Sequence, residues 1–309
     1  MTGQAVFDMR NCRLCPRECG VDRLAGEKGF CGMGPVPTAA RAALHFWEEP
    51  CLSGAEGSGT VFFSGCSLGC VYCQNREISR QRKGFPVPPE KLSGIFLSLQ
   101  EQGANNINLV TAAHFLPGVR EALLLAKNDG LKIPVVYNSG GNEQPEALAM
   151  MEGLIDVYLP DCKTLSRELA AKYSRCPDYP EKVMAAIREM VRQCGKPSFD
   201  ERGMMTRGVI VRHLVLPGCT GDSKRVLRAL KENFGGQIYV SILRQYTPMP
   251  WIASEAPELD RNVTEEEYDR VLDFAVRIGL DQGFMQEGEA VSESFIPAFQ
   301  GEGILETSF

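Results

Sequence analysis

The sequence predicts an α/β fold built as an open, partial (βα)6 barrel. From residue 60 onward, short β-branched and aromatic segments alternate with amphipathic helical segments, which is typical of βα units around a parallel sheet. Six segments have strand character, at residues 60–64, 107–111, 133–138, 155–160, 208–216 and 237–243. Six units are too few for a closed eight-stranded barrel, so we expect an open barrel whose mouth admits a large substrate.

The helical segments between these strands each carry one apolar face. Residues 88–102 place Leu92, Phe96 and Leu99 on one side, and residues 180–194 repeat the pattern with Ile187 at its centre. This spacing of apolar residues is that of an amphipathic helix. We expect these faces to cover the sheet.

Capping residues indicate where two later helices begin. Asp222 or Ser223 can cap the helical segment that ends near Phe234. Thr264, followed three residues later by Glu267, forms a capping box and predicts a helix start.

Length and composition predict a compact soluble protein. The chain has 309 residues, of which 44% are hydrophobic and 23% are charged, near the averages for globular proteins. We expect a cysteine-rich, metal-binding N-terminal segment at residues 1–50 and the partial barrel at 51–250. Residues 251–309 should form a C-terminal helical extension packed on the barrel.

Charge and hydropathy argue against two classes of partner. The net charge of −6 gives no basic surface for neutralising phosphates, so we expect no nucleic acid partner. No stretch approaches the roughly 18 apolar residues of a membrane span, and the start of the chain lacks a secretory pattern. We therefore expect a cytoplasmic protein with no membrane partner.

Three cysteines in the segment CSLGCVYC, residues 66–73, are the strongest indication of function. In a cytoplasmic protein, clustered cysteines favour metal or redox chemistry over disulfides, because cytosolic thiols are kept reduced. The loop cysteines, Cys66, Cys70 and Cys73, can hold a [4Fe-4S] cluster, which normally takes four cysteines, so one iron stays open. The alternative is structural zinc, yet such sites are closed by four ligands and no fourth Cys or His lies in this loop.

This loop resembles the signature of the radical S-adenosylmethionine (SAM) superfamily, including the aromatic Tyr72 before the last cysteine. The resemblance implies that the open iron binds the methionine group of SAM. It further implies that an electron from the reduced cluster splits the sulfonium to a 5′-deoxyadenosyl radical, so the loop cysteines are the catalytic ligands. A flavodoxin or a ferredoxin would be the reductant.

Later strand ends are similar to the SAM-binding positions of glycyl-radical-enzyme activases. Asn138 and Ser139 begin the turn NSGG after the third strand, Asp161 and Lys163 flank a cysteine after the fourth, and Arg212 lies on the fifth before Pro-Gly. The resemblance implies that these residues contact SAM, and a guanidinium fork suits its carboxylate and hydroxyl oxygens. An exposed rim pair is the alternative for the aspartate and the lysine, and pairing with a surface acid is the alternative for Arg212.

The turn after the second strand departs from the family pattern. Thr111 begins the sequence TAAH where many radical SAM proteins have a Gly-Gly-Glu-like turn. The hydroxyl of Thr111 or nearby backbone carbonyls are candidate substitutes for the contact to the methionine amino group.

A second group, the front cysteines, comprises Cys12, Cys15, Cys19 and Cys31. Four thiolates can close a metal site, and both zinc and a second [4Fe-4S] cluster accept such a set. The arrangement resembles the pyruvate-formate-lyase-activating-enzyme-related proteins. A structural staple for the N-terminal segment and an electron relay both remain open.

These features together predict a radical SAM enzyme that abstracts a hydrogen atom from a substrate at the barrel mouth. Family analogy makes a glycine of a partner glycyl radical enzyme the candidate target. Modification of a small molecule or another peptide is the alternative within enzymes. A non-catalytic iron–sulfur or zinc protein for electron transfer is the competing class.

Overall fold

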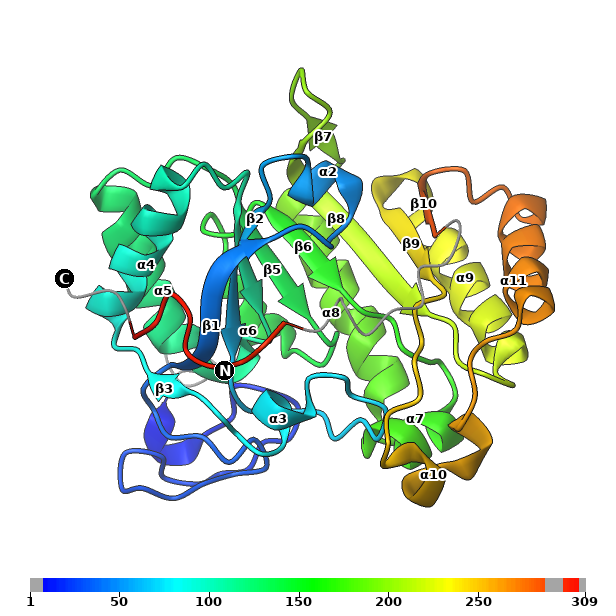
Figure 1. Ribbon diagram of the computed structural model, residues 1–309, viewed down its shortest axis with the longest axis horizontal. Helices are drawn as coiled ribbons and strands as arrows, with labels where there is room; N and C mark the ends of the chain where they lie inside the picture. The colour runs from blue at the N-terminus through cyan, green and yellow to red at the C-terminus, as the bar shows by residue number, and fades with distance from the viewer. Residues whose placement is uncertain (1–7, 287–296, 306–309) are drawn as a thin grey trace.

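A ten-stranded, mostly parallel sheet forms the centre of the computed structural model, which describes residues 8–286 and 297–305 (Figure 1). The strand order is β10-β9-β8-β6-β5-β4-β2-β1-β3, and β7 (Ser198–Phe199) pairs with β8 beside this path. The predicted α/β architecture is confirmed. The six strands expected from the sequence are all present and parallel: β2 (Ser58–Phe63), β4 (Ile107–Val110), β5 (Val135–Ser139), β6 (Val157–Pro160), β8 (Met205–Leu214) and β9 (Tyr239–Leu243).

Three further strands on the main path were not expected from the sequence. β1 (Thr38–His45) runs antiparallel to β2, and its alanine-rich sequence has low intrinsic strand preference. β3 (Phe85–Pro86) pairs with β1, and β10 (Gly283–Met285) adds a parallel strand beside β9. β1 therefore brings the N-terminal part of the chain into the sheet, while the predicted division into three regions stays a prediction.

Helices flank the sheet in the order expected for βα units (Figure 1). The longer ones are α4 (Pro89–Glu101), α5 (Leu116–Asn128), α7 (Arg167–Ser174), α8 (Tyr179–Cys194), α9 (Thr220–Phe234) and α11 (Glu265–Arg277). The short ones are η1 (Met9–Asn11), α2 (Pro50–Ser53), α3 (Arg76–Ser79), η2 (Ala113–Phe115), α6 (Pro145–Ala149), η3 (Gly235–Gln237), α10 (Ile252–Glu255) and η4 (Pro257–Leu259). None of the helices in the described parts of the chain combines the length and apolar character that crossing a membrane requires.

The two predicted helix starts have different outcomes. Thr264 caps α11 through a complete capping box with Glu267, as predicted. The predicted cap of α9 is wrong, because that helix begins at Thr220 and Asp222 and Ser223 lie inside its first turn. Ser223 instead uses its hydroxyl to bond the ring of His213 at 2.9 Å.

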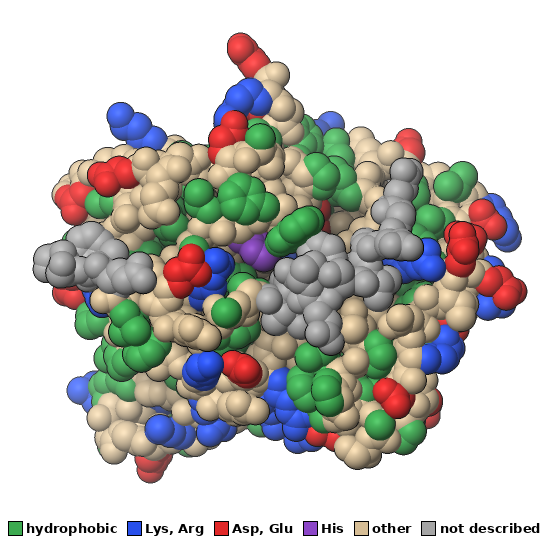
Figure 2. Space-filling view, viewed as in Figure 1, with side chains coloured by type: hydrophobic (Ala, Val, Ile, Leu, Met, Phe, Trp, Pro, Cys, Tyr) green, Lys and Arg blue, Asp and Glu red, His purple; other side chains and the backbone are tan. Residues whose placement is uncertain are grey.

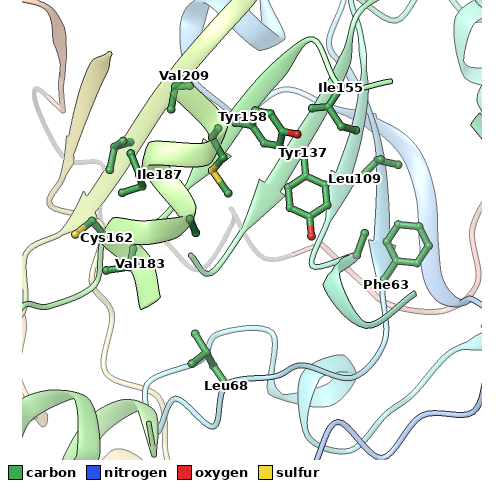
Figure 3. Packing of buried hydrophobic residues seen from close by; sticks show 14 of the residues in the cluster. Phe63, Leu68, Leu109, Tyr137, Ile155, Tyr158, Cys162, Val183, Ile187 and Val209 are labelled. Carbon is green, nitrogen blue, oxygen red and sulfur yellow. The ribbon is translucent and has the colours of Figure 1, made fainter. Parts of the chain in front are cut away.

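The core between the sheet and its helices is built from buried apolar and aromatic side chains (Figure 3). Tyr137 and Tyr158 from β5 and β6 meet edge to face at 5.8 Å, and Ile187 of α8 lies to one side of them. Burying each large apolar side chain contributes about 1.5–3 kcal/mol. This packing fixes the strands, so the loops at their carboxyl ends have a rigid base.

Gly141 and Gly153 have similar backbone angles but different surroundings. Comparing them distinguishes the free-energy cost of backbone strain from that of crowding. Gly141 after β5 has φ 76° and Gly153 has φ 79°, a region in which L side chains are rare. A methyl group at Gly141 would overlap the carbonyl oxygen of Asp161, whereas one at Gly153 would meet no atom within 4 Å. We predict that Gly153→Ala costs about 1 kcal/mol, and that Gly141→Ala costs a further 1–3 kcal/mol or so from crowding.

Urea unfolding of both variants and of the parent chain measures this difference directly. Equal losses for the two variants would show that the turn at Gly141 can yield, and would contradict the close packing beside Asp161.

Candidate active site

A cleft opens at the carboxyl ends of the parallel strands, where the loops after β2, β4, β5, β6 and β8 meet. In a parallel sheet these ends lie on one edge, so residues far apart in sequence are brought together there. All ten residues predicted for the cluster and for SAM line this cleft: Cys66, Cys70, Tyr72, Cys73, Thr111, Asn138, Ser139, Asp161, Lys163 and Arg212.

The loop cysteines lie between the end of β2 and the start of α3. All three are free thiols of intermediate exposure. Each sulfur has a polar neighbour. The backbone N–H of Leu68 donates to Cys66 Sγ at 3.3 Å, Cys70 Sγ donates to the Ser174 hydroxyl at 3.4 Å, and Cys73 Sγ lies 3.3 Å from the Ser79 hydroxyl.

These three sulfurs form a donor set that fits an iron–sulfur cluster. Burial raises the pKa of Cys66 and of Cys73, so neither thiol ionises readily by itself, whereas a bound metal deprotonates a coordinating thiol outright. Within residues 8–286 and 297–305, no group of three or more His, Cys, Asp or Glu side chains is arranged to hold a single metal ion. Each cysteine of a cubane binds a different iron, so the loop suits a cluster and leaves one iron open.

Tyr72 and Trp251 fix the shape of the cysteine loop. The Tyr72 ring is buried and packs edge-on against Tyr246 at 6.5 Å. The Trp251 indole N–H donates to the carbonyl of Val71 at 2.7 Å. The loop is therefore held by segments from the far end of the sheet.

The polar floor of the cleft consists of five side chains: Arg212, Lys163, Asp161, Glu48 and Asn138. Arg212 is at its centre because it bridges two carboxylates. Its Nε donates to Asp161 at 3.0 Å, its Nη1 to Glu48 at 3.0 Å, and its Nη2 to the Asn138 side-chain oxygen at 2.5 Å. Lys163 adds a second cation, donating to Asp161 at 2.6 Å. The four charged side chains are at most 26% exposed, so water screens these interactions only weakly.

The electrostatics of this floor favour a charged Asp161. Burial alone would raise the pKa of Asp161, but Lys163 and then Arg212 outweigh burial and lower it. Burial raises the pKa of Glu48 even though Arg212 opposes this. The floor thus holds opposite charges within bonding distance of one another. Both kinds of charge line the cleft and can bind charged groups of a ligand.

Two acidic residues near the site were missed by sequence reasoning. Glu48 follows the unexpected strand β1, and its Oε1 accepts bonds from Asn108 and Asn138 at 3.0 and 3.2 Å. Glu143 is buried beside Ser139, and burial raises its pKa to about 8. Neither residue belongs to a recognisable motif, so only the long-range pairing of β1 with β2 could have indicated Glu48.

The turn after β4 has an unusual backbone. Thr111 adopts φ 63°, a conformation that β-branched residues rarely take, and it lines the cleft. Such strain is concentrated at functional sites. His114 from the same turn points elsewhere: it is buried, and its ring bonds the carbonyl of Ser64 at 2.7 Å.

The front cysteines lie in the N-terminal segment, at the same edge of the sheet as α3 (Figure 1). Three of them are buried and Cys19 is exposed. Burial raises the pKa of Cys15 to about 12, and charge on the other three front cysteines would add to this rise. Arg17 from this segment donates to the carbonyl of Ser67, inside the cysteine loop, at 2.8 Å.

Removing the central cation should destabilise the protein in a pH-dependent way. We predict that Arg212→Met costs about 3 kcal/mol at neutral pH, because Glu48 is left buried without its cation, while Asp161 keeps only Lys163. In the variant, burial holds the pKa of Glu48 above that of the unfolded chain, because Arg212 no longer opposes this effect. The protonated form of Glu48 therefore stabilises the fold, and the deficit shrinks as the pH falls.

Urea unfolding of parent and variant at neutral and mildly acidic pH provides the check. Arg192→Met is the matched control, because the exposed pairs of Arg192 with Glu152 and Glu189 contribute little. A deficit for Arg212→Met that stays constant with pH would contradict the assignment of its partners.

The chain is similar to proteins of one family. The sequence model of the radical SAM superfamily matches residues 60–223. Over 286 residues the chain is 29% identical to Uncharacterized protein MJ0674 of Methanocaldococcus jannaschii. The aligned region covers 88% of this chain and 76% of that protein. Its fold is similar to that of Streptococcus suis SuiB bound to S-adenosylmethionine, with a TM-score of 0.50 and 10% identity over 73% of this chain.

The chain spans about half the length of SuiB, since the similarity covers 49% of it, and at 10% identity this likeness concerns the fold alone. The superfamily match is the stronger finding. It covers more than half of the chain and contains all three loop cysteines, so this protein belongs to the radical SAM superfamily, whose enzymes use a [4Fe-4S] cluster and S-adenosylmethionine.

Proposed function

We propose that this enzyme binds its cluster through the loop cysteines, binds SAM in the cleft, and abstracts a hydrogen atom from a glycine of a partner protein, as an activating enzyme does. One observation carries the cofactor part of this proposal. Ten residues chosen from the sequence, on five separate segments, line one cleft at the carboxyl ends of the strands. When bound, the cluster and SAM supply a one-electron cleavage of the sulfonium that yields the 5′-deoxyadenosyl radical.

The side chains of the floor have donors available for SAM. Arg212 has five N–H donors and Lys163 has three. Arg212 uses three on described residues and Lys163 uses one, so each cation retains two. Lys163 also lies close enough to Cys70 and Tyr72 to feel their charges. It is therefore the cation best situated for a carboxylate next to the loop cysteines.

Asp161 and Glu48 place carboxylate oxygens at the cleft, where they can accept hydrogen bonds from the ammonium group of SAM, which also carries a sulfonium. Asp161 keeps a charged carboxylate at the cleft because Lys163 and Arg212 lower its pKa against the effect of burial. Asn138 orients Arg212 by accepting a bond from Nη2. These residues bind and orient the ligand, and the buried walls of the cleft limit the access of water.

The rim of the cleft supports a macromolecular substrate. Trp47, which lines the cleft, and the adjacent Phe46 are 57% and 50% exposed. Figure 2 shows hydrophobic side chains gathered near the middle of one face, beside a histidine. Exposed apolar groups at a cleft are typical of surfaces that contact another protein. The choice of glycine as the target rests on the resemblance to activases.

Cleavage of SAM tests the catalytic part of the proposal. We predict that the anaerobically reconstituted protein, given dithionite and SAM, forms 5′-deoxyadenosine, and that Cys70→Ala forms none because its cluster lacks a ligand. Chromatographic measurement of the nucleoside gives the result. Cys194→Ala is the control, since Cys194 is buried on α8 and bonds the carbonyl of Asp156. A fully loaded wild-type protein that cannot cleave SAM would favour an electron-transfer role.

Affinity for SAM tests the floor of the cleft. We predict that Lys163→Met weakens SAM binding about tenfold, which corresponds to roughly 1.4 kcal/mol from one lost charged hydrogen bond. Equilibrium dialysis of labelled SAM with the loaded protein measures this change. Lys172→Met is the matched control, because Lys172 pairs with Glu258 at the surface. Equal affinities for both variants would remove Lys163 from the SAM site.

Transfer of deuterium tests the target. An extract from cells grown on α-deuterated glycine is divided into a protein fraction and a small-molecule fraction, and each is added to the reaction. We predict that 5′-deoxyadenosine acquires deuterium from the protein fraction. Label from the small-molecule fraction alone would support modification of a small molecule and contradict the activating-enzyme proposal.

A further inference from the structure

We propose that the front cysteines hold a second [4Fe-4S] cluster, and that this cluster passes electrons to the cluster at the loop cysteines. The second cluster can be present whether or not the proposed function is correct. Its role as an electron relay rests on the proposed function. Four observations from the N-terminal segment support the proposal.

The first observation is that every front sulfur has an N–H donor. The guanidinium of Arg23 lies 3.8 Å from Cys12 Sγ. The backbone N–H of Phe30 donates to Cys19 Sγ at 3.3 Å. Backbone groups of Arg17 and Met33 bond the two remaining sulfurs, Cys15 and Cys31 respectively. Hydrogen bonds to sulfur favour the thiolate and tune iron–sulfur clusters, so the segment is arranged for four anionic ligands.

The second observation is a buried cation that has no carboxylate partner. Arg23 is 1% exposed and donates to the carbonyls of His114, at 2.7 Å, and Gly34. Its Nε has no bonding partner, and no salt bridge to it occurs among the residues that the structure describes. A buried charge without a counter-charge is strongly unfavourable. Four thiolates around a cluster carry net negative charge and provide that counter-charge beside Cys12, whereas four neutral thiols do not.

The third observation is that arginines contact the backbone of both cysteine groups. Arg17 bonds the carbonyls of Ser67 and Arg175 at 2.8 and 2.7 Å, and Arg82 packs directly against Gly32. Neither Arg17 nor Arg82 takes part in a salt bridge within the described ranges. Positive side chains therefore lie beside both cysteine groups, which favours two centres that would both be anionic.

The fourth observation is direct packing between the two metal-binding loops. A methyl group placed on Gly65 would lie 3.0 Å from the carbonyl oxygen of Cys31 and would also meet Met33. Gly65 immediately precedes Cys66 in the chain. One front ligand and one loop ligand thus belong to backbones in contact, while Cys19 is exposed to solvent.

The relay requires no bond making or proton transfer in the protein. A low-potential one-electron donor of the flavodoxin or ferredoxin class reduces the front cluster and is itself oxidised. The front cluster returns to its oxidised state as it reduces the loop cluster by one electron. Zinc has no accessible redox change and therefore does not fit this role.

Metal content tests the second cluster without reference to catalysis. We expect about eight irons and no zinc per wild-type chain, and about four irons for Cys15→Ala. Cys194→Ala should match the wild type. Electron paramagnetic resonance of a reduced variant with all three loop cysteines changed to Ala should still show a cluster, unaffected by SAM. About four irons and one zinc in the wild-type chain, with the zinc lost in Cys15→Ala, would overturn the proposal.

The rate of cluster reduction tests the relay. In Cys15→Ala, rapid-freeze spectroscopy should show that reduced flavodoxin reduces the loop cluster about tenfold more slowly, or worse, than in the wild type. An unchanged rate would overturn the relay. If wild-type protein contains two clusters and both are reduced normally, yet SAM is not cleaved, the proposed function fails while the second cluster stands.

Discussion

The structure depends on one geometric constraint: the carboxyl ends of its parallel strands meet at a single edge of the sheet. The core of apolar side chains between the sheet and α4, α5 and α8 fixes this edge. The loop cysteines follow β2, and Asp161 and Arg212 come from β6 and β8. Because the strands are rigid, these side chains keep their separation without a ligand, and little free energy is needed to order the site on binding.

The sequence predicts this edge well because its signals are local. Each of the six predicted strands is a short β-branched segment, and the residues chosen for SAM lie on those segments or directly after them. Long-range features could not be predicted. β1 is alanine-rich and becomes a strand only by pairing with β2, so Glu48, which follows it, carries no local signal. The predicted cap of α9 was wrong because Ser223 bonds the ring of His213, on another element, instead of the backbone at the start of the helix.

Two groups of charge have different purposes in this chain. In the cleft, Arg212 and Lys163 are matched by Glu48 and Asp161. The floor is therefore close to neutral, and it presents both cationic and anionic groups. Beside the front cysteines, Arg23 forms no salt bridge with a carboxylate among the described residues, and its guanidinium lies 3.8 Å from Cys12 Sγ. A balanced site suits a ligand with both charges, as SAM has, and an unbalanced cationic site suits an anionic metal centre.

We propose that one iron of the loop cluster lacks a protein ligand and binds SAM directly. Electron–nuclear double resonance on the reduced cluster, with SAM carrying nitrogen-15 in its amino group, tests this contact. We expect a nitrogen-15 coupling that appears only with labelled SAM. A loaded and reduced cluster that shows no such coupling under saturating SAM would contradict it.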